Sequence, residues 1–312
     1  MSASMKNNTI LIIVLILIII VSLFTLVRWQ QSSIKTSSAN KLIITTSFYP
    51  LYFFTSQIGG DQVEIINITP AGAEPHDYEP TPQDLTRIEN SQLLVLNGRG
   101  LEIWGNKAKE NLKDKPITIV EVEADLMNQE IDEESKTVQD PHVWLAPPLA
   151  KKEAQKIAEA LIKVDSTHKN TYTENTSKLM IQLDELDTKY KQGLTNCQQK
   201  DFVTSHAAFG YLAKTYSLNQ VSISGLSPDE EPSPQKLAEV AEFAKAHQIS
   251  YIFFESLVSP KFSQTIAKEV GAKTLVLNPL EGLTPEEINA GATYFTVMKE
   301  NLVNLRTALQ CQ

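Results

Sequence analysis

Three histidines, His76, His142 and His206, lie far apart in a chain that holds only five histidines. Each stands where an apolar segment or an extended loop meets the next element, and such junctions line the clefts of α/β folds. A fourth candidate, Glu281, follows another strand-like run. Three imidazoles and one carboxylate can converge on a single ion, and this set of ligands favours zinc.

The other two histidines, His168 and His247, have polar neighbours on what we interpret as helix surfaces or helix ends, and we assign them no role. The spacing between the remaining three is too wide for a zinc finger or for a His-Glu-x-x-His helix. A site built from them must therefore be assembled by the fold and not by one local motif.

Five segments carry a resemblance to a known family. In chain order they are TPAGAEPHDYEPTPQDL, DPHVWLAPP, VTSHAAFGYLAKTY, GLSPDEEPSPQKLAEV and LNPLEGL. Together they resemble the zinc/manganese solute-binding proteins of ABC transporters, the ZnuA-like group, and the similarity runs from about Lys41 to the C-terminus. The resemblance implies capture of a divalent metal ion outside the membrane and its delivery to an ABC permease.

The same resemblance implies that the three histidines bind the metal and that a late acidic residue completes the shell. Many members have Asp where this chain has Asn278, and an amide is a poor zinc ligand. We therefore predict Glu281 as the fourth ligand, with Glu74 and Asp77 as alternatives. Asp77 and Asp140 are each close in sequence to a histidine, and each is a candidate either for orienting an imidazole or for capping a turn.

The periodicity predicts an α/β protein, because short β-branched or aliphatic runs alternate with stretches of helical spacing. The strand-like runs are residues 41–46, 63–69, 93–96 and 117–122 in the first half, and 201–204, 221–223, 251–254 and 274–277 in the second. Between the two series, residues 150–194 have almost unbroken helical spacing, interrupted near 164–168. The apolar stripe of this region is Leu179, Leu183, Leu186 and Tyr190.

We therefore predict two parallel-sheet βα lobes joined by a long rigid helix, with the metal site in the cleft between the lobes, which matches the architecture of the family. The expected divisions are residues 1–40 as a membrane anchor or signal segment with a tether, 41–165 as the N-terminal lobe, 166–195 as the linking helix and 196–312 as the C-terminal lobe. Closure on the metal should be modest and local, because a helical connector limits hinge motion.

The first 40 residues suggest where the protein resides. Residues 9–27 carry no charge and, at about 1.5 Å per residue, just span a ~30 Å hydrocarbon core. A cleaved signal peptide is the alternative, but the run is long for one, and no cysteine follows it for lipid attachment. We expect an uncleaved anchor on the extracytoplasmic face of a bacterial membrane, followed by a flexible tether over residues 30–40.

The whole chain, with 42% hydrophobic and 21% charged residues, has the composition of a globular protein. A net charge of -9 argues against a nucleic-acid partner, and we expect a monomer. The segment 127–140 contains no histidine and is predicted to be a solvated acidic loop.

The chain contains two cysteines, Cys197 and Cys311. An even count in an extracytoplasmic protein favours a disulfide, which would fasten the C-terminal helix to the second lobe. A thiolate metal site is the alternative, and it needs more nearby ligands than these isolated cysteines offer.

Three classes of function compete for such a site. Catalytic zinc keeps an open position, whereas three histidines plus Glu281 fill a tetrahedral shell, so we do not expect an enzyme. A surface adhesin that uses the same fold remains an alternative to transport. Manganese is the alternative metal, although three nitrogen ligands favour zinc.

Overall fold

In the computed structural model, the described residues are 41–312, apart from 99, 124, 125, 127–129, 134 and 135, together with Ile16 and Ser22. The chain divides into two units, Met1–Lys41 and Leu42–Gln312. Most of the predicted N-terminal anchor and its tether lies outside the described residues. Among the residues that are described, no helix has the length and apolar character needed to cross a membrane.

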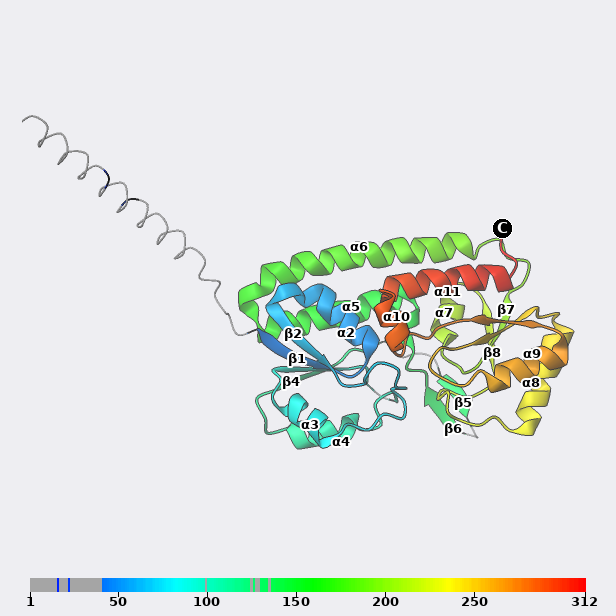
Figure 1. Ribbon diagram of the computed structural model, residues 1–312, viewed down its shortest axis with the longest axis horizontal. Helices are drawn as coiled ribbons and strands as arrows, with labels where there is room; N and C mark the ends of the chain where they lie inside the picture. The colour runs from blue at the N-terminus through cyan, green and yellow to red at the C-terminus, as the bar shows by residue number, and fades with distance from the viewer. Residues whose placement is uncertain are drawn as a thin grey trace, which may run out of the picture. The chain divides into compact units, whose positions relative to one another are not determined.

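The unit Leu42–Gln312 contains two four-stranded parallel sheets (Figure 1). The first sheet has the order β2-β1-β3-β4 and the second has the order β10-β9-β7-β8. The strands are β1 (Leu42–Thr46), β2 (Val63–Asn67), β3 (Leu93–Leu96), β4 (Thr118–Glu121), β7 (Asp201–Thr204), β8 (Asn219–Ser222), β9 (Tyr251–Phe254) and β10 (Lys273–Val276). Each sheet places its own first strand between its second and third, so the two lobes share one topology, and the predicted fold class is confirmed.

The connections between strands are mainly helices, as parallel pairing requires. The helices are α2 (Tyr49–Gly59), α3 (Pro82–Glu89), α4 (Gly105–Leu112), α5 (Pro147–Val164), α6 (Lys169–Gly193), α7 (Gly210–Thr215), α8 (Pro234–Ala246), α9 (Lys261–Val270), α10 (Pro285–Asn289) and α11 (Tyr294–Ala308). Short 3-10 turns are η1 (Gly60–Gln62), η2 (Val143–Leu145) and η3 (Ser166–His168). The last of these accounts for the predicted interruption of the long helical region.

Helix α6 runs alongside α11 and packs on α2, α5 and α11, so it contacts helices from both halves of the unit (Figure 1). Its predicted apolar stripe is confirmed, since Leu179, Leu183, Leu186 and Tyr190 are all buried. The hydroxyl of Tyr190 donates a hydrogen bond of 2.7 Å to the Met298 carbonyl on α11. This bond fixes α6 to the C-terminal helix.

One hydrophobic cluster extends through both lobes. It includes Ile44 and Val95 from the first sheet together with Phe202 and Phe253 from the second. Close packing of this kind resists large relative movement of the lobes, because separating them would expose apolar surface to water. Modest, local closure on the metal stays a prediction, and this packing favours it.

The segment 127–140 was expected to be a loop, and that expectation is wrong. Strands β5 (Glu130–Glu133) and β6 (Lys136–Gln139) pair antiparallel there, with Ile131 opposite Val138. The prediction relied on the many charged residues of this segment. It overlooked two short runs with β-branched residues, which favour strands.

Cys197 and Cys311 form a disulfide across 114 residues of sequence, as predicted. The bond joins the end of the C-terminal helix to the segment between α6 and β7.

Candidate metal centre

His76 lies in the loop between β2 and α3, and its side chain is 6% exposed. The start of this loop is held by Thr69, whose hydroxyl donates a 2.8 Å hydrogen bond to the Ser47 carbonyl. Further along, the Gly72 amide donates to the Leu283 carbonyl at 3.0 Å, which ties this loop to the segment that follows β10. The loop that carries His76 is thereby anchored to both lobes.

His142 is fully buried between β6 and η2. One carboxylate oxygen of Asp140 accepts hydrogen bonds from the His142 backbone amide at 2.9 Å and from Nδ1 at 2.8 Å. The imidazole is thereby oriented with Nε2 free to face the cluster. Both roles considered for Asp140 are present, since the bond to Nδ1 orients the imidazole and the bond to the His142 amide caps the turn.

His206 is fully buried after β7, and Glu255 accepts a hydrogen bond of 2.6 Å from its Nδ1. The same Glu255 oxygen accepts from the Ser205 hydroxyl. Glu255 directly follows β9, which neighbours β7 in the sheet. Sequence reasoning missed Glu255, and the available signal was an acidic residue at the carboxyl end of a strand.

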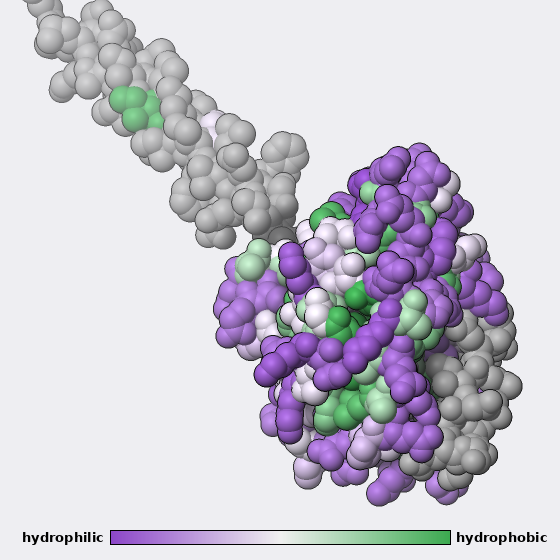
Figure 2. Space-filling model, turned by 90° about the vertical axis from the view of Figure 1, so that its right-hand side faces the viewer, coloured by the Kyte–Doolittle hydropathy of each residue, from purple (hydrophilic) through white to green (hydrophobic). Residues whose placement is uncertain are grey.

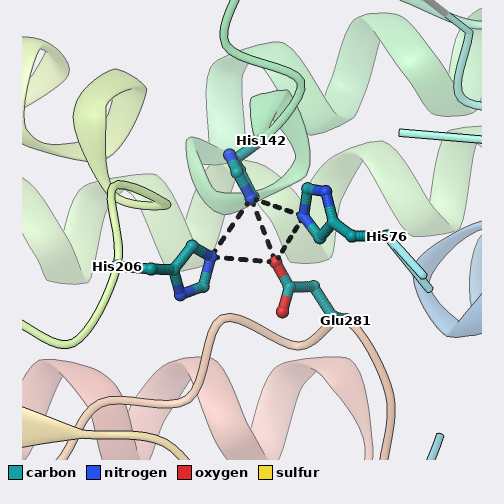
Figure 3. Close-up of side chains that lie close together, drawn as sticks. All are labelled: His76, His142, His206 and Glu281. Atoms are coloured by element: carbon teal, nitrogen blue, oxygen red, sulfur yellow. Dashed lines mark hydrogen bonds and ion pairs between the residues drawn. The ribbon is translucent and has the colours of Figure 1, made fainter. Parts of the chain in front are cut away.

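Glu281 is fully buried in the loop after β10, and the structure brings it together with all three histidines (Figure 3). One of its carboxylate oxygens lies 3.2 Å from Nε2 of His76, 3.0 Å from that of His142 and 3.2 Å from that of His206. The Nε2 atom of His142 lies 3.2 Å from that of His76 and 3.4 Å from that of His206.

These separations match a four-coordinate ion. A tetrahedral zinc with ligands at about 2.0–2.1 Å places the ligand atoms about 3.3 Å from one another. The four candidate atoms all lie within 4.8 Å of one another, and the described part of the chain contains no second cluster of this kind. The other carboxylate oxygen of Glu281 is buried and has no hydrogen-bond partner, which a nearby cation would compensate.

The three histidines favour the ionised form of Glu281. Burial alone would raise the pKa of Glu281, but the charge of His206 and hydrogen bonds from the three imidazoles lower that pKa well below its usual value. Burial likewise disfavours a charged His206, yet Glu255 and Glu281 hold its pKa well above the usual range. The pKa of His142 is raised against burial by Asp140 and Glu281, whereas burial lowers the pKa of His76.

The alternative acids lie outside this cluster. Glu74 accepts a hydrogen bond of 3.2 Å from the His76 amide, and burial raises its pKa to about 10, so its neutral form is favoured. Asp77 is exposed and hydrogen-bonds to Asp229, so it does not orient an imidazole. The side chain of Asn278 is hydrogen-bonded elsewhere, to Leu280, Ser256 and Glu287.

The two histidines to which we assigned no role lie apart from the cluster. His168 pairs with Asp165 at 2.6 Å, and His247 pairs with Asp201 at 2.7 Å. Both contacts join residues at helix or strand ends near the surface.

Comparison with known proteins gives a consistent result. Residues 44–308 match the family described as "Zinc-uptake complex component A periplasmic". The chain is 40% identical over 284 residues to the high-affinity zinc uptake system protein ZnuA of Bacillus subtilis, covering 88% of this chain and 89% of that protein.

Two solved structures are also similar. The Zn(II)-bound ZnuA-like domain of Streptococcus pneumoniae AdcA is 40% identical with a TM-score of 0.76, over 86% of this chain and 99% of that domain. This chain covers only 58% of the Zn(II)-bound AdcA structure that is not limited to this domain. The laminin-binding protein Lmb of Streptococcus agalactiae, described as having adhesin and metal-transporting activity, is 33% identical with a TM-score of 0.77, over 86% of this chain and 99% of that one.

Proposed function

This chain belongs to the family of periplasmic A components of zinc-uptake complexes, and we propose that it binds one zinc ion through His76, His142, His206 and Glu281. The family is one of transport binding proteins, so the protein is not an enzyme. The bound ion is cargo, and the chemistry is ligand exchange. Capture of the ion is followed by its delivery to an ABC permease.

The observation that carries the proposal is the set of four buried ligand atoms with five separations of 3.0–3.4 Å. Three imidazole nitrogens and one carboxylate oxygen suit zinc, whereas manganese prefers a larger share of oxygen ligands. Four protein ligands fill a tetrahedral shell and leave no position for an activated water. Such a site suits binding of an ion for transport and not hydrolysis.

Release must come from small movements of loops. His76 and His142 are contributed by the first half of the unit, while His206 and Glu281 are contributed by the second. Because the hydrophobic cluster continues through both lobes, a shift of the loop carrying His76 or of the loop carrying Glu281 is a lower-cost route than separation of the lobes. His76 is the most exposed of the four ligands, so we expect the ion to enter and leave past the loop that carries His76.

Residues 1–40 complete the proposal. Their apolar run would hold the protein on the extracytoplasmic face of the membrane, close to its permease. We propose that the protein acts as a monomer. On the face drawn in Figure 2, hydrophilic residues surround a smaller central area of hydrophobic residues.

The direct test is the metal content of protein isolated without added metal, followed by zinc titration against a competing chelator. We expect one zinc per chain and loss of tight binding when a cluster histidine is replaced by Ala. Manganese as the main occupant, or unchanged zinc affinity in all four alanine variants, would overturn the proposal.

The similarity to Lmb favours a second candidate function, adhesion to an extracellular-matrix protein. Transport predicts that deletion of the gene prevents growth in zinc-poor medium and that added zinc restores it. Adhesion predicts saturable binding of the purified protein to immobilised laminin. The two functions can coexist, and these two measurements test them separately.

A further inference from the structure

The loop that carries Glu281 adopts a conformation that its sequence does not favour. Leu280, the residue before Glu281, has a φ of 59°, in the left-handed region that non-glycine residues seldom adopt. A bulky residue remains there only where the surrounding structure imposes the conformation. Leu280 is buried in the hydrophobic core, its amide is bonded by Asn278, and Asn278 in turn is bonded by Asn301.

The side chain of Asn278 closes the loop from within. Its Oδ1 accepts a hydrogen bond of 2.7 Å from the Leu280 amide. Its Nδ2 donates to the Ser256 hydroxyl and to the Glu287 carboxylate, each at 3.0 Å. Glu287 belongs to the first turn of α10, where it also forms a capping box with Thr284. The amide of Asn278 therefore joins the two ends of the segment that contains Glu281.

Asn301, on α11, holds Asn278 itself. Its Oδ1 accepts from the Asn278 backbone amide at 2.9 Å, and its Nδ2 donates to the Asn278 carbonyl at 2.7 Å. Asn301 is 1% exposed and Asn278 is 3% exposed, so both partners are removed from competing water. Asn278 lies two residues beyond the end of β10, so its backbone N–H and C=O are not paired within the sheet. The side chain of Asn301 bonds both groups instead.

We propose that Asn278 and Asn301 are positioning residues for metal binding, which together hold Glu281 against the three histidines. The inference rests on the proposed function, because it assumes that Glu281 is a ligand. It assigns Asn278 a role that requires an amide. Aspartate could accept from Leu280, but it has no N–H to donate to Glu287 and would place two carboxylates in contact.

The first test compares two asparagines of one helix. Asn301→Ala removes the clamp on Asn278, whereas the control Asn304→Ala removes a hydrogen bond of 2.9 Å to the Val276 carbonyl in β10 and leaves the loop untouched. Zinc affinity is measured by chelator competition, and the coordination geometry is read from the visible absorption of the Co²⁺-loaded proteins. Thermal unfolding of both variants measures how much each substitution lowers the stability of the fold.

We expect Asn301→Ala to weaken zinc binding by about 10-fold or more, on the scale of ~1.4 kcal/mol per decade, and to change the Co²⁺ spectrum. Asn304→Ala should keep the affinity and the spectrum of the parent even where it lowers the melting temperature. Parent-like affinity and spectrum in Asn301→Ala would overturn the inference.

The second test is a rescue. Asn278→Asp should weaken zinc binding, and Asn278→Asp combined with Glu287→Gln should restore it, because the introduced glutamine supplies the missing N–H to the introduced aspartate and removes the like charge. Unchanged affinity in the single variant, or no recovery in the double variant, would overturn the inference. Glu281→Ala, measured in parallel, separates the two hypotheses: if it binds zinc like the parent, Glu281 is not a ligand and the proposed ligand set fails first.

Discussion

The indole nitrogen of Trp144 donates a hydrogen bond of 2.7 Å to the carbonyl of Pro279. Trp144 stands two residues after His142, and Pro279 stands two residues before Glu281, so this single bond connects two of the proposed ligand segments across the lobes. The carbonyl of Trp144 in turn accepts from the Tyr294 hydroxyl at 2.6 Å, which ties the contact to α11. Two of the proposed ligand segments are therefore joined by hydrogen bonds that do not involve the ligand side chains.

Trp144→Phe keeps an aromatic ring but removes this hydrogen bond. The buried Pro279 carbonyl loses its partner, so we expect a loss of about 1–3 kcal/mol in the free energy of unfolding. Zinc should also dissociate several-fold faster, as measured by transfer to a fluorescent chelator. Trp104→Phe, at the start of α4 in the first lobe, is the control and should leave the dissociation rate unchanged. An unchanged rate in Trp144→Phe would show that the contact does not serve the site.

Alanine replacements of the four proposed ligands should have unequal effects. Glu281→Ala should weaken zinc binding by about 10-fold or more, while His76→Ala, His142→Ala and His206→Ala should each cost more, because each removes a stronger donor. Calorimetry with a competing chelator measures these differences. His247→Ala, which lies outside the cluster, should bind zinc like the parent, and a comparable loss in that variant would point to a general structural effect.

Zinc binding should release protons near neutral pH. The pKa of His206 is held well above its usual value by Glu255 and Glu281 despite burial, so protons compete with the metal above the ordinary imidazole range. Affinity should therefore fall as pH decreases through neutrality. Calorimetry at pH 7 in buffers of different ionisation enthalpy counts the released protons. Glu255→Gln should release fewer of them, and equal proton release in both proteins would contradict this explanation.

Stability should fall as pH rises, because buried carboxyl groups must stay protonated in the folded protein. Burial raises the pKa of Glu153 well above its usual value, and neither of its carboxylate oxygens has a hydrogen-bond partner. Above the unfolded pKa of about 4.5 the folded state binds the extra proton, so this group lowers the free energy of unfolding by up to about 1.4 kcal/mol per pH unit until its folded pKa is reached.

Glu153→Gln removes that proton uptake without changing the shape of the side chain. Urea unfolding of the metal-free protein should show a shallower decline between pH 6 and pH 8 and higher stability than the parent at pH 8. Glu159→Gln, which is exposed on the same helix, should follow the parent. A parent-like slope in Glu153→Gln would mean that other groups cause the decline.

Much of the architecture was readable from local pattern. The β-branched runs predicted the eight strands of the two parallel sheets, since such residues pack well on a pleated surface. The stripe Leu179, Leu183, Leu186 and Tyr190 predicted the buried face of α6. The three histidines and Glu281 were selected by residue type and by resemblance, and the structure brings all four together.

What only the tertiary structure decided are the contacts that hold these side chains in place. Glu255 meets His206 across 49 residues, Trp144 meets Pro279 across 135, and Asn301 meets Asn278 across 23. Sequence periodicity does not identify such residues, because each acts through one hydrogen bond to a partner that is distant in the sequence. Secondary structure follows from short-range sterics and burial patterns, whereas the orientation of a buried polar group depends on which distant donor or acceptor the packed chain places beside it.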